Sequence, residues 1–138
     1  MKVGDELVTS HAFSVQDVLD FARVSGDGAE HHLQPDEQGR LFVHGLLTAS
    51  LPTRIGSRMN VWAHEMTCQW MRPVYTDETI RCVVRVEELA PSDRGTWMNV
   101  SIHCTNPADD VVLKGHCNGV SPYPLSRLSE MSVAELSD

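Results

Sequence analysis

The chain has 138 residues, the length of one domain, and 41% of them are hydrophobic, which is enough for one sizeable core. Eleven Lys and Arg against nineteen Asp and Glu give a formal net charge of −8, which argues against a nucleic-acid partner or docking on an anionic membrane. The four cysteines form no C-x-x-C motif, and no stretch approaches the roughly 20 apolar residues of a membrane span. We therefore predict a single soluble, cytoplasmic domain over residues 1–138.

The first predicted element is a short helix. Ser14 can cap its first turn together with Asp17, and Gly26 is a helix-stop signal. Between these residues the apolar side chains recur at helical spacing, at Val15, Val18, Leu19 and Ala22. The following segment, 27–40, is polar and turn-rich, and we predict a loop there.

A buried helix is predicted from Gly45 to about Met59, because this stretch is apolar on most sides. Pro52 lies inside it and has no backbone N–H to donate, so we expect a kink at that residue.

The rest of the chain alternates apolar and polar residues, as strands with one buried face do. The apolar positions form four sets: Met66, Cys68 and Trp70; Ile80, Cys82, Val84 and Val86; Met98, Val100, Ile102 and Cys104; Val111, Leu113 and Cys117. The connections between the sets are short and rich in turn residues, which indicates an antiparallel meander. One helix packed against one curved sheet is an α+β fold. The polar segment 125–138 is expected to be a frayed helix or a flexible tail.

The predicted loop carries an acid and base pair, Asp27 and His32. A carboxylate and an imidazole can exchange protons near neutral pH. Residues five apart on a helix point away from each other, so these two can meet only in a turning loop, which Gly26 and Gly28 can supply. A solvated polar loop without chemistry is the alternative.

A second candidate is the pair His44-Gly45 at the start of the apolar helix. A backbone N–H there has no partner within the helix and can stabilise an oxyanion. The alternative, which the pair taken alone favours, is a helix start with a small residue for packing. His103-Cys104 and His116-Cys117 do not make a zinc site, because adjacent strand residues point to opposite faces. The sequence has no zincin, P-loop or hydrolase-elbow motif, and we predict no metal and no cofactor.

Together, these segments resemble the MaoC-like dehydratases, a family that includes the (R)-specific enoyl-CoA hydratases. The matched motifs are Phe13-Ser14, Asp17-Val18, Phe21-Ala22, Ser25-Gly26-Asp27, His32 and the run from Val43 to Ser50. The resemblance implies a hotdog fold, in which an antiparallel sheet wraps a long helix, and a homodimer. It implies a trans-2-enoyl thioester of coenzyme A or acyl carrier protein as the substrate.

The resemblance also assigns roles to residues. Asp27 and His32 would hold a water between them, the N–H of Gly45 would bind the thioester oxygen, and Thr53 would orient the Asp27 carboxylate. The chain departs from the family in one motif, since Ala29-Glu30-His31 stands where the family has Asn-Pro-x. For substrate binding we add His44, which precedes Gly45, and the cations Arg54 and Arg58, with Arg72 as a further basic residue near the same helix end.

Three functions follow as hypotheses. The first is a hydro-lyase of the enoyl-CoA hydratase or 3-hydroxyacyl dehydratase type. The second is a hotdog acyl-CoA thioesterase, which would use an acid on the central helix, but 45–60 contains none. The third is a non-catalytic protein that binds acyl thioesters, which the missing Asn-Pro pair favours.

Overall fold

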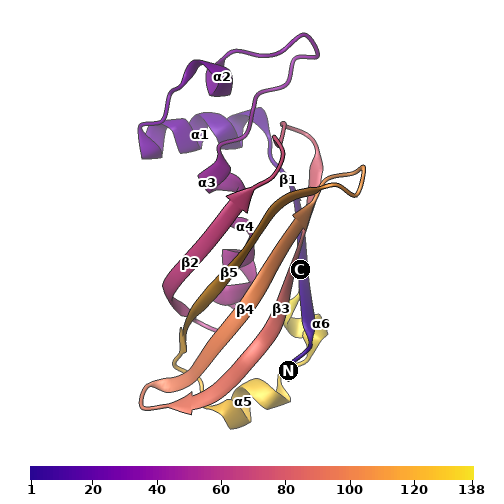
Figure 1. The fold of residues 1–138 in the computed structure, drawn as a ribbon. Helices are drawn as coiled ribbons and strands as arrows, with labels where there is room; N and C mark the ends of the chain where they lie inside the picture. The colour runs from indigo at the N-terminus through magenta and orange to yellow at the C-terminus, as the bar shows by residue number, and fades with distance from the viewer.

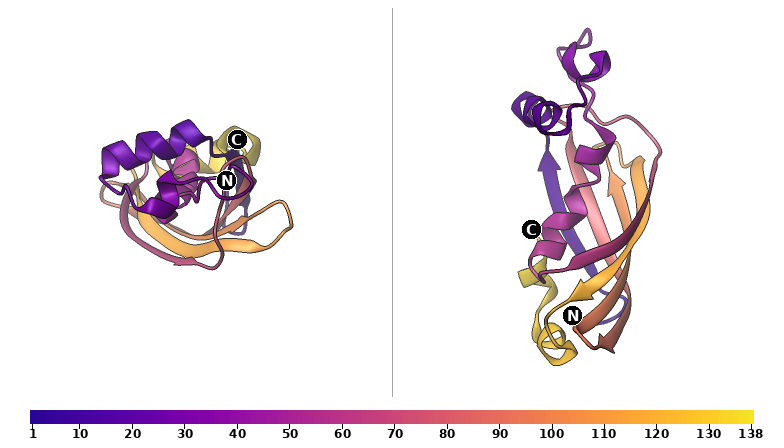
Figure 2. Two further views of the ribbon diagram at one scale, coloured as in Figure 1. Left: turned by 90° about the horizontal axis from the view of Figure 1, so that it is seen from above. Right: turned by 90° about the vertical axis from the view of Figure 1, so that its left-hand side faces the viewer.

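The computed structural model describes residues 1–138, and a curved antiparallel sheet of five strands dominates it (Figure 1). The strands are β1 (Glu6–Ala12), β2 (Trp62–Trp70), β3 (Thr79–Ser92), β4 (Gly95–Thr105) and β5 (Val111–Ser121), in the spatial order β1-β3-β4-β5-β2. Helix α4 (Leu51–Ser57) lies on the concave side of this sheet (Figure 2). The α+β class and the four predicted antiparallel strands are confirmed.

The alternation of side chains along the strands explains which face of the sheet is buried. On β3, Ile80, Cys82 and Val86 are buried, whereas Arg81 and Arg85 between them are exposed. Buried side chains from the concave face of the sheet and from α4 meet in one hydrophobic core of 22 residues. The core thus fixes the position of the helix over the sheet.

Helix α1 (Val15–Ser25) has the predicted limits. The Ser14 hydroxyl accepts a hydrogen bond from the N–H of Asp17, and the Asp17 carboxylate accepts one from the N–H of Ser14. Gly26 ends the helix with φ at +79°, a conformation that glycine adopts without steric cost. This left-handed residue turns the chain directly before Asp27.

The predicted apolar helix is not one kinked helix but two helices. Helix α3 (Gly45–Thr48) ends after one turn, and α4 starts at Leu51, with Pro52 in its first turn. Pro52 cannot donate a hydrogen bond to Thr48, the last residue of α3, and its ring crowds the carbonyl four residues back, so the helix breaks rather than bends.

Two other elements, β1 and α2 (Glu30–Leu33), were not predicted from the sequence. Strand β1 pairs with β3 along its whole length, and helix α2 forms one turn within the predicted loop. The segment 125–138, expected to be a frayed helix or a flexible tail, forms two short helices, α5 (Leu125–Glu130) and α6 (Val133–Leu136). Leu128 and Leu136 in them are fully buried in the core. No helix of the structure has both the length and the hydrophobicity that a membrane-spanning helix requires.

Candidate active site

The Asp27 carboxylate is oriented by its own loop. Helices α1 and α2 lie beyond one end of the sheet, and Asp27 lies in the connection between them (Figure 1). Its N–H donates to the Ser25 hydroxyl over 3.1 Å, and its Oδ1 accepts a hydrogen bond from the N–H of Ala29 over 3.2 Å. These two contacts leave Oδ2 free to face His32.

His32 lies on α2 and is held in one tautomer. Its Nδ1 lies 2.7 Å from the carbonyl oxygen of Phe42, which can only accept, so Nδ1 carries the proton and Nε2 of the neutral ring carries a lone pair. Nε2 lies 3.5 Å from Asp27 Oδ2, with no direct hydrogen bond between them. The His32 side chain is buried, whereas that of Asp27 is 49% exposed. The structure therefore brings the predicted acid and base pair together.

His44 lies beneath this pair, at the residue before α3. It is 1% exposed, and its Nε2 lies 2.8 Å from the backbone oxygen of Asp27. Its ring stacks on His32, with centroids 3.8 Å apart and an angle of 20° between the planes. Its Nδ1 is buried without a hydrogen-bond partner. Its burial argues against the predicted contact between the His44 side chain and the substrate.

Three side chains at this site carry atoms that can bind a metal ion: Asp27, His32 and His44. One such atom from each lies within 4.8 Å of the other two. A metal needs lone pairs that converge on one point at about 2.0–2.1 Å from each nitrogen. Two imidazoles stacked at 20° have nearly parallel planes, and their in-plane lone pairs do not converge. The arrangement favours proton transfer over metal binding.

Gly45 begins α3, and its N–H has no acceptor among the protein groups. The indole Nε1 of Trp70 donates to the Gly45 carbonyl over 2.8 Å, and a Cβ at residue 45 would lie 2.8 Å from the same nitrogen. A cavity of about 310 Å³ lies beside these two residues and is also lined by Thr48 and Arg72. This role of Trp70 was not predicted from the sequence, because the contact joins residues 25 apart.

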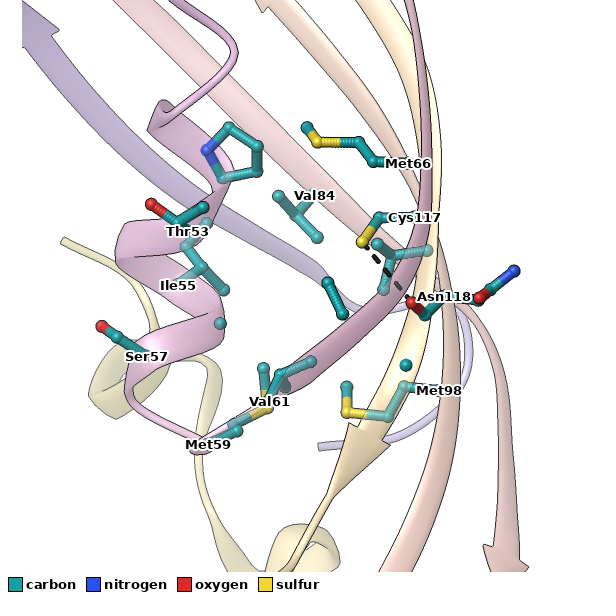
Figure 3. Close-up of a pocket in the computed structure, with 15 residues that line it drawn as sticks. Thr53, Ile55, Ser57, Met59, Val61, Met66, Val84, Met98, Cys117 and Asn118 are labelled. Atoms are coloured by element: carbon teal, nitrogen blue, oxygen red, sulfur yellow. Dashed lines mark hydrogen bonds between the residues drawn. The ribbon is translucent and has the colours of Figure 1, made fainter. Parts of the chain in front are cut away.

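A second, apolar cavity of about 270 Å³ lies between α4 and the concave face of the sheet (Figure 3). Ile55 lines it from the helix, and Met66, Met98 and Cys117 line it from the strands. Neither cavity is lined by Asp27 or His32.

Three other predicted residues lie away from the acid and base pair. The hydroxyl of Thr53 donates to the carbonyl of Ser50 in its own helix, so it does not orient the Asp27 carboxylate. Arg54 and Arg58 reach the Asp138 carboxylate, with N–O distances of 3.4 and 3.5 Å. The structure thus separates these three residues from the dyad.

No protein-family model matches the sequence. The chain is 29% identical over 130 residues to a mitochondrial 3-hydroxyacyl-[acyl-carrier-protein] dehydratase of Arabidopsis thaliana, covering 88% of this chain and 78% of that protein.

Two solved structures share the fold. The (R)-hydratase from A. caviae involved in PHA biosynthesis has a TM-score of 0.76 at 21% identity, over 86% of this chain and 96% of that one. A MaoC-like dehydratase from Rhodospirillum rubrum has a TM-score of 0.64 at 16% identity, over 88% and 92% of the two chains. These similarities confirm the predicted fold: the chain has the hotdog fold that the (R)-hydratase and the MaoC-like dehydratase structures share.

Proposed function

We propose that the protein is a hydro-lyase that adds water reversibly to a trans-2-enoyl thioester and forms a 3-hydroxyacyl thioester. The observation that carries this proposal is the 3.5 Å approach of Asp27 Oδ2 to His32 Nε2. Both atoms are acceptors when His32 is neutral, and one water can donate a hydrogen to each of them. The names of the Arabidopsis dehydratase and the A. caviae (R)-hydratase describe this class of reaction.

In the hydration direction, the bridging water attacks the β-carbon of the enoyl thioester. Asp27, assisted by His32, removes a proton from that water as the C–O bond forms. The electron pair of the double bond moves toward the thioester oxygen, where the N–H of Gly45 donates to the developing enolate. The dyad then delivers this proton to the α-carbon, so that the OH and the H of the water are divided between the β-carbon and the α-carbon. Dehydration is the reverse of these steps.

The two cavities suggest how the substrate lies. Gly45 and Trp70 border the cavity where the thioester would bind, and α4, which follows α3, borders the apolar cavity. We place the acyl chain in the apolar cavity, because apolar side chains of the helix and sheet line it (Figure 3).

The carrier of the acyl group, coenzyme A or acyl carrier protein, requires a cation at the entrance. Arg72 lines the cavity at Gly45 and makes no ion pair, whereas Arg54 and Arg58 are paired with Asp138. Arg72 is therefore the better placed of the basic residues to contact the polar arm of the carrier.

We also propose that the protein is a homodimer. Strand β2 is an edge strand, and its free edge offers unpaired backbone groups to a second chain. Trp62 and Trp70 at its ends are 68% and 48% exposed. Large apolar side chains on an unpaired edge are typical of an interface. The cytoplasmic location stays a prediction.

An assay of purified protein with crotonyl-CoA and longer enoyl-CoA thioesters tests the activity, with chiral analysis of the hydroxy product. Asp27→Asn keeps an oxygen that can accept from the N–H of Ala29 but removes the basic carboxylate. We expect the rate to fall by about 10²–10⁴-fold, the usual contribution of a general base.

The matched control is Asp20→Asn, which changes an exposed acid on α1 that contacts Gln16 and should leave the rate unchanged. Normal hydration by the Asp27→Asn protein would refute the assignment of the dyad. Release of free thiol from an acyl-CoA without hydration would instead indicate a thioesterase.

A further inference from the structure

We propose that His44 is a positioning residue that holds Asp27 and His32 in their reactive arrangement and does not itself contact the substrate. This inference rests on the proposed hydration of an enoyl thioester. It differs from the substrate-binding role that the sequence suggested for His44.

The first observation concerns the loop that carries Asp27. Apart from one bond to His44, the hydrogen bonds of residues 26–29 are local. Their partners lie within six residues of each other, on α1, the loop itself or α2. The bond from His44 Nε2 to the Asp27 carbonyl, 2.8 Å long, spans 17 residues. It is therefore the one hydrogen bond that anchors this loop to the segment that leads into α3.

The second observation concerns His32. One face of its ring stacks on His44, at a centroid separation of 3.8 Å. Two residues before His44, the carbonyl of Phe42 accepts the Nδ1 hydrogen of His32. The edge of Phe21 packs against His44, with centroids 4.8 Å apart. The orientation of both reactive side chains therefore depends on the segment 42–44, which runs directly into Gly45.

The third observation excludes a direct chemical role. His44 is 1% exposed, so a substrate cannot reach its ring. Because Nε2 donates to a carbonyl, the neutral ring has a lone pair at Nδ1, which is buried without a partner. The Thr48 hydroxyl, one turn later on α3, is the other buried side-chain polar atom without a hydrogen-bond partner.

Two variants separate the hydrogen bond from the ring. His44→Phe keeps an aromatic ring to stack on His32 but removes the donor to Asp27, whereas His44→Gln offers an amide N–H at a similar reach. We expect kcat to fall by about 100-fold in His44→Phe with little change in KM, because a small misplacement of reacting groups has that effect. The Gln variant should recover at least a tenth of the wild-type kcat.

A measurement without substrate tests the same contact. Amide hydrogen exchange at residues 27–29 should be faster in His44→Phe than in the wild type, while exchange in the central strands β3 and β4 stays unchanged. His103→Phe is the matched control, since His103 lies exposed on β4, and it should change neither kcat nor exchange in the loop.

These experiments distinguish a wrong role for His44 from a wrong function for the protein. A wild-type protein that hydrates no enoyl thioester would reject the function, and loop exchange would still test the anchoring by His44. Unchanged kcat and unchanged loop exchange in His44→Phe would overturn the inference. A raised KM at normal kcat in both variants would overturn it as well, because it would indicate that His44 binds substrate.

Discussion

At the scale of single residues, Gly45 is constrained by a neighbour rather than by its own backbone. Its φ is not in the left-handed region, so the chain conformation there does not require glycine. The requirement comes from Trp70, whose indole nitrogen would lie 2.8 Å from an added Cβ. Close approach of an aromatic donor to the backbone therefore explains the glycine, and it leaves the Gly45 N–H accessible.

Gly45→Ala should displace the Trp70 side chain and break its hydrogen bond to the backbone. We expect a loss of about 1 kcal/mol in the free energy of unfolding, typical of one hydrogen bond, and slower hydration. In a Trp70→Ala background, Gly45→Ala should cost no stability, because the clash is gone. Chemical denaturation of the four proteins measures this coupling.

The control is Gly56→Ala in α4. A Cβ there would meet Val61 at 3.7 Å, an ordinary contact, so this change should stabilise the protein by about 0.5–1 kcal/mol. Equal effects of Gly45→Ala with and without Trp70 would contradict the explanation.

At the scale of elements, α1 is stabilised at its first turn by the reciprocal bonds of Ser14 and Asp17. The backbone N–H of Ser14 lowers the pKa of Asp17, partial burial opposes this, and the nearby His11 lowers the pKa further. A carboxylate whose pKa is lower in the folded state stabilises the fold above its usual pKa of 3.8. That stabilisation is lost as pH falls below this value and through the folded pKa.

Asp17→Asn should therefore be less stable than the wild type at neutral pH, and the difference should shrink as pH falls below about 4. Ser14→Ala removes a hydroxyl that does not titrate, and it should cost about 1 kcal/mol. Thermal unfolding between pH 3 and about 7 measures both. A difference for Asp17→Asn that stays constant over this range would show that its charge does not stabilise α1.

At the scale of the whole molecule, one edge of the sheet, strand β2, is not covered by any other segment of the chain. The C-terminal segment covers the edge formed by β1, since the backbone of Val8 bonds to Ser137 and Asp138. The other edge, β2, is exposed along nearly its whole length. A dimer that pairs two copies of β2 would cover this edge by two-fold symmetry.

Analytical ultracentrifugation should therefore show a dimer, and the melting temperature should rise with protein concentration. Replacing Thr67 and Gln69 with Lys puts like charges opposite each other in a symmetric pair of edge strands, and the dimer should weaken. The control carries Lys at Gln38 and Ser92, which are exposed and outside β2. A monomeric wild type, or equal association of both double variants, would contradict pairing through β2.

The sequence determined the elements whose signals are local. The capping residues and Gly26 set both ends of α1, and strict alternation identified four of the five strands. Strand β1 was missed because its only strongly apolar pair, Leu7 and Val8, is adjacent rather than alternating, and its buried Thr9 is polar. For the tail the sequence left a frayed helix and a flexible segment open, because single buried residues, Leu128 and Leu136, carry no periodic signal.

For the site, the motif resemblance selected Asp27, His32 and Gly45, and the fold placed the first two in contact. Only the tertiary structure decided what holds them. Contacts between residues 10 to 25 apart in the sequence hold the site together. They are made by the Phe42 carbonyl, the buried His44 and the Trp70 indole. A backbone carbonyl has the same chemistry at every residue, so its role depends entirely on where the folded chain places it. Local sequence patterns record propensity and periodicity, whereas these distances exist only once the core has formed.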